Sequence, residues 1–282
     1  VMRILVYDVA ASSGGALTVL NSFYEEFCKD TENEYIFVLS VCELKEQPHI
    51  KVLNFPWIKK SPLHRMYFDQ VLAHKLVKKY HADKVLSLQN IELPHAGVPQ
   101  IVYEHNALPF SEYKFRPQEA FRPWYSQQIL GRMMKRSIRR AEQVLVQTNW
   151  MKEEIIRQCG IPADRVEVKF PPVEMLKTHP WKMDEACPTF FYPAGPPAYK
   201  NHRTFLKACE LLKEQGMEDY RVIWTVTGEE NEGMKKLKAE AEEKKLPIEF
   251  IGPVPRTQLF EQYASSILVF PSYIETIGLP LM

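Results

Sequence analysis

The stretch TFFYPAGPPAYKNHR, residues Thr189–Arg203, decides how the second half of this chain folds. It opens with a short apolar run at 189–192, continues through a loop of glycine and prolines, and ends where a helical spacing of apolar residues begins. The same order of apolar run, loop and helical pattern recurs downstream. It predicts alternating strands and helices, which is typical of a parallel sheet wrapped by helices.

Seven elements are expected in this second half. Apolar runs predict strands at 189–192, 221–227, 248–251 and 268–270, and three- and four-residue spacings predict helices at 203–215, 233–245 and 258–265. The first half repeats the alternation, with strands expected at 4–7, 35–40, 84–88, 100–103 and 143–147 and helices at 16–28 and around 71–79. Each half therefore predicts a domain of its own.

The segment 164–188 separates the two halves. Its apolar periodicity breaks down and prolines gather in it, which predicts an interdomain linker. We expect an α/β fold with two Rossmann-like, doubly wound parallel-sheet domains, residues 1–178 and residues 179–282. The second domain is expected to be incomplete, because the sequence stops where a helix should follow its last strand.

Composition excludes several classes of protein. A formal net charge of +1 lacks the excess typical of a nucleic-acid binder. Five scattered cysteines without a Cys-x-x-Cys pair disfavour a disulfide framework and a zinc site. The first apolar run ends at Asp8, unlike a signal peptide, and no apolar stretch approaches the roughly 18 residues of a membrane span. We expect a cytoplasmic protein, with attachment to a membrane surface left open.

Two motifs of the first half follow predicted strands. Ser12-Ser13-Gly14-Gly15-Ala16 opens the first helix, where glycines, free amides and the helix dipole favour an anion; a plain tight turn explains the motif equally well. Tyr103-Glu104-His105-Asn106 puts His105 at the carboxyl end of a parallel strand, the edge where open α/β sheets bind ligands. A lone histidine is more often structural, but here its imidazole could hydrogen-bond a sugar hydroxyl.

Two further motifs occupy the corresponding places in the second half. Lys200 lies between a strand and a helix amino terminus, where an ammonium could oppose a diphosphate, although a lysine in a loop is usually only solvated. The stretch Phe270–Pro280 presents Glu275 and then small residues at a strand's carboxyl end, which suits a polyhydroxylated ligand; it could also be only a turn. We regard this last motif as the most specific.

Together these motifs resemble the family 4 retaining glycosyltransferases, over the whole length of the chain. Residues 141–152 are similar to the family's late amino-domain strand and the helix after it. Residues 195–201 resemble its phosphate-contacting Gly-x-x-x-x-Lys-Asn/Gly loop, and residues 251–254 its loop beside the nucleobase. Residues 270–281 look like the first part of the family's Glu-x7-Glu signature, with Glu275 as the first glutamate.

The resemblance implies the GT-B architecture and a reaction. A nucleotide-diphosphate sugar carrying UDP or GDP would bind mainly to the second domain and a saccharide or lipid-linked acceptor to the first, with retention of anomeric configuration. No metal or cofactor is expected, because lysine, loop amides and a helix amino terminus stabilise the leaving diphosphate in such enzymes. Synthesis of a bacterial surface polysaccharide is the expected role.

The resemblance also implies roles for individual residues. Lys200 would face the phosphates, and the sugar hydroxyls would be held by Glu275 and by the amides of Thr276, Ile277 and Gly278. Gly15 would let the first domain close over the diphosphate, His105 would contact the transferred sugar, and Val254 would lie against the base.

The sequence departs from the family pattern in three places. Pro196 stands where the family often has an arginine, and Thr276 and Ile277 replace the usual Gly-Phe after the first glutamate. The second glutamate, expected to bind the ribose, would come directly after Met282. We therefore expect a carboxyl-terminally truncated chain that binds donor poorly and transfers slowly or not at all.

Other readings remain open from the residues alone. A basic cluster on a predicted helix could meet anionic lipid or a lipid-diphosphate acceptor, although a solvated helix face explains it as well; it consists of Arg132, Lys135, Arg136, Arg139 and Arg140. A GT-B nucleotide-sugar epimerase or a phosphorylase would need clustered carboxylates and histidines or a Schiff-base lysine, and neither is evident. A non-enzymatic binding module is the remaining alternative.

Overall fold

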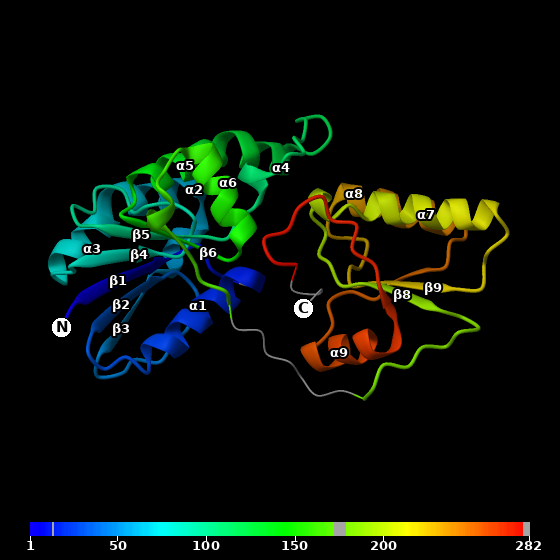
Figure 1. Cartoon of the computed structure of the whole chain (residues 1–282), viewed down its shortest axis with the longest axis horizontal. Coiled ribbons are helices and arrows are strands. Elements are labelled where there is room, and N and C mark those ends of the chain that lie inside the picture. Colours follow the sequence, from blue (N-terminus) through cyan, green and yellow to red (C-terminus); the bar gives the residue numbers. More distant parts are fainter. Residues whose placement is uncertain (13, 172–178, 279–282) are drawn as a thin grey trace. The chain divides into compact units, whose positions relative to one another are not determined.

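The computed structural model describes residues 1–12, 14–171 and 179–278 (Figure 1). The chain forms two compact units, one of Val1–Glu112 with Tyr125–Pro172 and one of Tyr113–Trp124 with Val173–Met282. The domain boundary expected after residue 178 falls outside the described residues.

The first unit is built on a parallel sheet, with seven strands among the described residues. They run in the order β3-β2-β1-β4-β5-β6-β7, which reverses direction between β1 and β4. The strands are β1 (Arg3–Asp8), β2 (Glu34–Leu39), β3 (Ile50–Asn54), β4 (Lys84–Ser87), β5 (Gln100–Glu104), β6 (Gln143–Val146) and β7 (Val166–Val168). This is the doubly wound order of Rossmann-like folds, with one strand added at the β6 edge.

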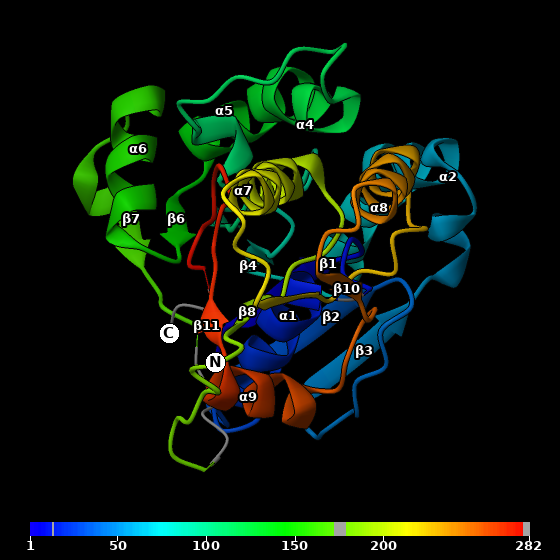
Figure 2. The same cartoon turned by 90° about the vertical axis from the view of Figure 1, so that its right-hand side faces the viewer.

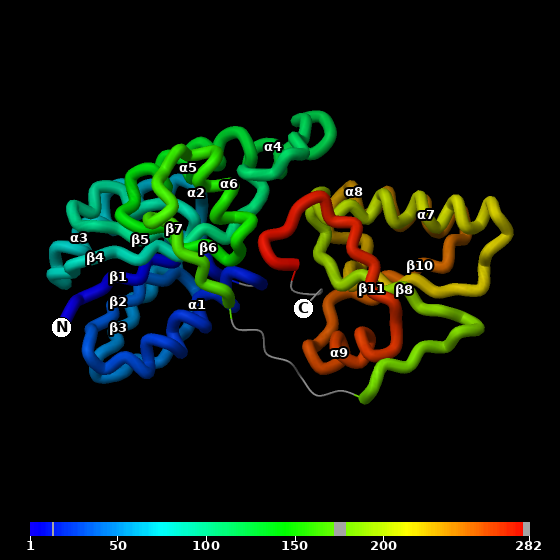
Figure 3. The backbone as a smooth tube through the Cα atoms, in the orientation of Figure 1, coloured from blue at the N-terminus to red at the C-terminus, as the bar shows by residue number. Residues whose placement is uncertain are grey.

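Helices cover both faces of this sheet. The helical segments of this unit are α1 (Gly14–Phe27), η1 (Pro56–Lys60), α2 (Pro62–Tyr67), η2 (Phe68–Leu72), α3 (Ala73–Lys79), η3 (Leu108–Phe110), η4 (Ser126–Leu130), α5 (Gly131–Arg140), α6 (Asn149–Cys159) and η5 (Ala163–Arg165). Helix α4 (Phe121–Tyr125) belongs to the second unit except for its last residue. Helix α1 lies on one face, and α2, α3 and α5 lie on the other (Figures 1 and 3). A doubly wound sheet has this arrangement because its crossovers are right-handed.

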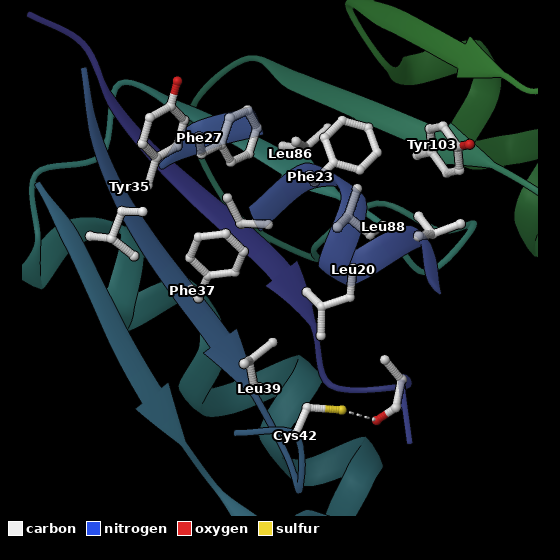
Figure 4. Close-up of a cluster of buried hydrophobic side chains, with 14 of the residues drawn as sticks. Leu20, Phe23, Phe27, Tyr35, Phe37, Leu39, Cys42, Leu86, Leu88 and Tyr103 are labelled. Atoms are coloured by element: carbon white, nitrogen blue, oxygen red, sulfur yellow. Dashed lines mark hydrogen bonds between the residues drawn. The ribbon is translucent and has the colours of Figure 1, made fainter. Parts of the chain in front are cut away.

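The period-two alternation of strand side chains divides the core between these faces. Val6 belongs to a cluster with Leu20 and Phe23 of α1, whereas its neighbours Leu5 and Tyr7 belong to the cluster under η2 and α3. In the α1 cluster, aromatic side chains of the helix and of β2 face one another (Figure 4). Burial on both faces explains why these strands read as continuous apolar runs.

The second unit contains a smaller parallel sheet, of four strands within the described residues, in the order β10-β9-β8-β11. Its elements are β8 (Thr189–Tyr192), η6 (Ala198–Lys200), α7 (His202–Glu214), β9 (Arg221–Trp224), α8 (Glu232–Glu243), β10 (Ile248–Phe250), α9 (Arg256–Ser265) and β11 (Ile267–Leu268). Helices α7 and α8 lie on one face and α9 on the other (Figures 1 and 2). The strand order reverses between β8 and β11.

The α/β fold class and the expected alternation are confirmed, with several differences. The sequence patterns did not predict β3, α2 or α4, and the expected linker at 164–188 was wrong at its start, because β7 lies inside it. Strand β7 has only three residues, too few to show a period, and it is a strand because it pairs in register with β6. That pairing joins residues about twenty positions apart, so no local pattern reports it.

Candidate functional site

The most convergent polar site of the second unit lies at the point where its strand order reverses. Lys200 ends η6 after β8, and Glu275 follows β11. In open α/β sheets the carboxyl ends of the two strands that flank such a reversal form the ligand-binding crevice. The Lys200 ammonium and a Glu275 carboxylate oxygen are 2.5 Å apart, with side chains 19% and 22% exposed. The structure thus brings together the two residues predicted to hold phosphate and sugar.

Hydrogen bonds join the loops that carry this pair. The Tyr192 hydroxyl donates to the Lys200 carbonyl at 2.6 Å and lies 2.7 Å from the Ser272 hydroxyl. The Tyr273 amide donates to the Tyr199 carbonyl at 2.9 Å. Since Tyr192 belongs to buried β8, the pair is positioned by the rigid sheet and does not depend on the loops alone.

Asn201 explains the sequence of the loop that carries Lys200. Its backbone is left-handed, with φ 60° and ψ 39°, a conformation that only glycine and, less often, asparagine or aspartate adopt without strain. Its side-chain amide donates to the Pro271 carbonyl at 3.0 Å, and its oxygen accepts from the Thr204 hydroxyl at 2.9 Å. A Lys-Asn or Lys-Gly pair is therefore what this turn requires.

Two buried groups border the pair. Burial lowers the pKa of His202 to about 4, so its imidazole is neutral at pH 7. Burial also raises the pKa of Tyr199, and the Glu275 carboxylate adds to the shift. Lys200 and Glu275 form the ion pair at the centre of the site, and an anionic ligand of Lys200 would compete with Glu275 for the ammonium.

The other predicted residues of the second unit also follow strands. Thr276 and Ile277 are half-buried, and Gly278 is buried with a φ of 65°, so its backbone conformation favours glycine. Val254 follows β10, an edge strand separated from β8 by β9. It lies at the same edge of the sheet as Lys200 but in a loop farther along it.

Gly15 and His105 belong to the first unit, after β1 and in the loop after β5. Gly15 lies in the first turn of α1, and a Cβ built on it would meet nothing within 4 Å. His105 is half-buried, its amide donates to the Asn90 side-chain oxygen at 2.7 Å, and its Nε2 lies 3.1 Å from the Asn90 side-chain nitrogen. Burial lowers the pKa of His105 to about 4, so it offers a neutral imidazole at pH 7.

The sequence patterns missed a polar network at the point where the first sheet reverses, between β1 and β4. Arg65 of α2 donates to Asp69 at 2.7 Å and to Gln89, just after β4, at 2.9 Å. The Tyr7 hydroxyl donates to the other oxygen of Asp69. Asp8, the last residue of β1, is 1% exposed, and burial raises its pKa to about 6. The available signal was the position of Asp8 directly after an apolar run.

Glu104 is a second buried carboxyl that the sequence patterns did not single out. It is fully buried at the end of β5, and burial raises its pKa well above the usual range. One oxygen accepts from the Asn106 amide at 3.0 Å, and the other has no hydrogen-bond partner among the described residues. Glu104 therefore fixes the loop that carries His105.

The predicted basic cluster on α5 is divided by the structure. Lys135 donates to the Gln158 side chain at 2.7 Å, Arg139 to the Cys159 carbonyl at 3.1 Å, and Arg140 pairs with Glu92 at 3.1 Å. Arg132, Arg136, Arg139 and Arg140 are exposed. Three members of the cluster thus also hold the first unit together, while four of the five lie on its surface.

The described residues offer neither a metal site nor a membrane-spanning helix. No group of three or more His, Cys, Asp or Glu side chains there is arranged to hold a metal ion. None of the described helices has the length and apolar character needed to cross a bilayer.

Comparison with known proteins assigns both halves of the chain. Residues 13–175 match the model of Glycosyltransferase Family 4, and residues 181–282 match that of Glycosyl transferases group 1. No curated protein sequence matches the chain.

Solved structures share the fold. The apo form of the lipopolysaccharide outer core galactosyltransferase WaaB is similar with a TM-score of 0.63 and 16% identity, over 100% of this chain and 77% of that one. WaaG, a glycosyltransferase involved in lipopolysaccharide biosynthesis, is similar with a TM-score of 0.64 and 12% identity, over 99% of this chain and 77% of that one. A third solved structure, described as "Trehalose-6-phosphate from E. coli bound with UDP-2-fluoro glucose", is similar with a TM-score of 0.60 and 10% identity, over 99% of this chain and 80% of that one. At such low identity these likenesses show the fold alone, and that fold is the GT-B class of two Rossmann-like units.

Proposed function

The chain belongs to glycosyltransferase family 4, and from this premise we propose that it is a retaining glycosyltransferase that moves a sugar from UDP or GDP to a saccharide or lipid-linked acceptor. The observation that carries the proposal is the convergence of Lys200 and Glu275 at the reversal point of the second sheet. The carboxyl ends of the strands at such a reversal point are where an open α/β sheet binds its ligand.

Each partner has a separate task in the proposed reaction. The Lys200 ammonium would turn from Glu275 to the diphosphate and stabilise the charge that develops as the glycosidic bond breaks. The released Glu275 carboxylate would accept hydrogen bonds from sugar hydroxyls, together with the amides of Thr276, Ile277 and Gly278. Lys200 and these amides would do this without a metal ion or a cofactor.

The acceptor and the site of action are part of the proposal. We place the acceptor on the first unit, where Gly15 would approach the diphosphate and His105 the transferred sugar. We place the process in bacterial surface polysaccharide synthesis, which the names of WaaB and WaaG support. A peripheral contact with an anionic membrane would use Arg132 and Arg136, which flank the half-exposed Met133. Flotation with liposomes that contain anionic lipid should then decrease in an Arg132→Glu, Arg136→Glu variant.

A nucleotide-binding experiment tests the donor site. Titration of the protein with UDP, GDP and their sugars should give binding that weakens roughly tenfold or more in Lys200→Ala for nucleotide and nucleotide sugar alike. Glu275→Gln frees the Lys200 ammonium and should not weaken the bare nucleotide, but it should remove the advantage of the nucleotide sugar over the bare nucleotide. Lys207→Ala, an exposed lysine of α7, is the matched control and should leave binding unchanged.

The outcomes separate the proposal from its alternatives. If Lys200→Ala and Lys207→Ala bind nucleotide with equal affinity, the proposed donor site is wrong. Conversion of the bound nucleotide sugar to its epimer, without transfer, would replace the transferase with an epimerase. Nucleotide binding without transfer to any member of an acceptor panel would favour a binding module.

A further inference from the structure

The first unit has a cation at its own reversal point that the proposed donor chemistry does not use. Lys59, in η1, reaches back across the carboxyl edge of the sheet and donates to the Ala10 carbonyl at 2.8 Å, in the loop that follows β1. An ammonium has three N–H donors, and among the described residues that of Lys59 forms no ion pair. It therefore presents a charge and spare donors at the edge where this sheet binds its ligand.

A second cation lies close by in a fixed orientation. Arg65 is near enough to Lys59 to lower the pKa of the lysine, with burial as the larger cause. The guanidinium is held by Asp69 through Nε and by Gln89 through one terminal nitrogen, so its position does not depend on a ligand. Both carboxylate oxygens of Asp69 accept a hydrogen bond, because the second oxygen accepts from the Tyr7 hydroxyl. The charge of Arg65 is thus balanced locally and that of Lys59 is not.

Asp8 is the carboxyl group that interacts electrostatically with Lys59, and its ionised form is poorly stabilised by hydrogen bonds. Asp8 Oδ1 accepts from the Ala11 amide at 3.1 Å, whereas Oδ2 is buried and has no hydrogen-bond partner among the described residues. Within that part of the chain the ionisable groups that face Asp8 are Cys42 after β2, Lys59 of η1 and Arg65 of α2. A buried carboxylate with one unsatisfied oxygen becomes neutral at little cost.

We propose that Lys59, beside Arg65, binds an anionic phosphate group of the acceptor at the carboxyl edge of the first sheet, and that Asp8 takes up a proton from solvent as this anion binds. The inference rests on the proposed function and names the acceptor class, a phosphorylated saccharide or a lipid phosphate. The physical reason is that two anions beside the same cation repel each other, and protonation of the buried Asp8 carboxyl removes this repulsion when the phosphate binds.

The first experiment measures binding of a hexose phosphate by calorimetry. Lys59→Ala and Lys59→Gln should each weaken binding roughly tenfold or more, and the glutamine variant can still donate to the Ala10 carbonyl, which controls for loss of that contact. Lys60→Ala is the matched control, an exposed lysine next in the chain, and should bind as the unaltered protein does. In parallel, flotation of the protein with vesicles that contain phosphatidate should depend on Lys59 only if the source is a lipid phosphate.

The second experiment tests proton uptake. Inorganic sulfate, whose charge is constant over the range, is titrated from about pH 5.5 to about pH 7.5 in buffers of different ionisation enthalpy. Unaltered protein should bind sulfate more weakly as the pH rises and should take up part of a proton on binding. Asp8→Asn, which is isosteric and neutral, should bind more tightly near pH 7.5 and without proton uptake. A role of Asp8 in folding alone would not produce this difference.

The outcomes are distinct from those of the donor test. If hexose phosphate binding depends on Lys59, the acceptor is a soluble phosphorylated saccharide. If only flotation depends on Lys59, the acceptor is a lipid phosphate. Equal behaviour of the Lys59 and Lys60 variants in both assays overturns the inference, as does an unchanged pH profile in Asp8→Asn. Nucleotide binding by the same variants should remain intact; its absence in every variant, including the unaltered protein, would count against the proposed function instead.

Discussion

Asn201 shows how a single residue can serve the site through its backbone. Asn201→Ala and Asn201→Gly both lose the side-chain contacts to Pro271 and Thr204. Only alanine is strained at a φ of 60°, so Asn201→Ala should be less stable than Asn201→Gly by about 1 kcal/mol in urea denaturation. Equal stabilities would mean that the left-handed turn does not persist in solution.

Asp8 makes stability depend on pH. Because its pKa is raised from 3.8 to about 6, the folded protein binds the proton more tightly than the unfolded chain does. This contribution to stability is fully present below about pH 4 and is lost as the pH rises through about 6, by at most about 3 kcal/mol. The free energy of unfolding should therefore fall less over this range in Asp8→Asn than in the unaltered protein. Parallel pH curves for the two proteins would contradict the raised pKa.

At the scale of elements, helix α6 has a capping residue at each end. The Thr148 hydroxyl accepts from the Met151 amide at 3.2 Å at its start, and Gly160 adopts a φ of 66° at its end. Thr148→Ala should cost about 1 kcal/mol in thermal or urea unfolding, because one amide of the first turn loses its partner. Thr148→Ser keeps the hydroxyl and should stay within a few tenths of a kcal/mol. A serine variant as unstable as the alanine variant would point to lost packing of the methyl group.

Longer elements with strong patterns were predictable, and short ones were not. The pattern for α1 came within two residues of each observed end, and the run at Thr189–Tyr192 matched β8. Strand β7 was not predicted because three residues are too few to show the two-residue alternation of a strand. Helix α2 escaped because no buried residue marks an inward face on it, although Pro62 at its first position and Ser61 before it are ordinary start signals.

For the molecule as a whole, ligand binding should follow sheet topology. Addition of UDP should protect backbone amides of residues 193–201 and 269–278 from hydrogen exchange, since these loops follow β8 and β11 at the reversal point. Residues 216–220, at the amino edge of the same sheet, should exchange at an unchanged rate. Protection confined to 216–220 would place the nucleotide at the wrong edge.

The sequence by itself determined the class of fold and the candidate residues of the donor site. Alternation of apolar runs with helical spacings is a local property, and so is the need for asparagine or glycine in a left-handed turn; both can be read without a neighbour in space. Lys200 and Glu275 could be named because each follows a predicted strand and stands in a motif that resembles the family's pattern.

Only the tertiary structure decided how these residues meet. Lys200 and Glu275 are 75 positions apart and form an ion pair because β8 and β11 lie side by side. The pKa of Asp8, the network of Arg65, and the internal contacts that divide the basic cluster likewise depend on burial and on strand order. These are set by long-range packing, in which residues distant in sequence remove water from one another, and no local period contains that information.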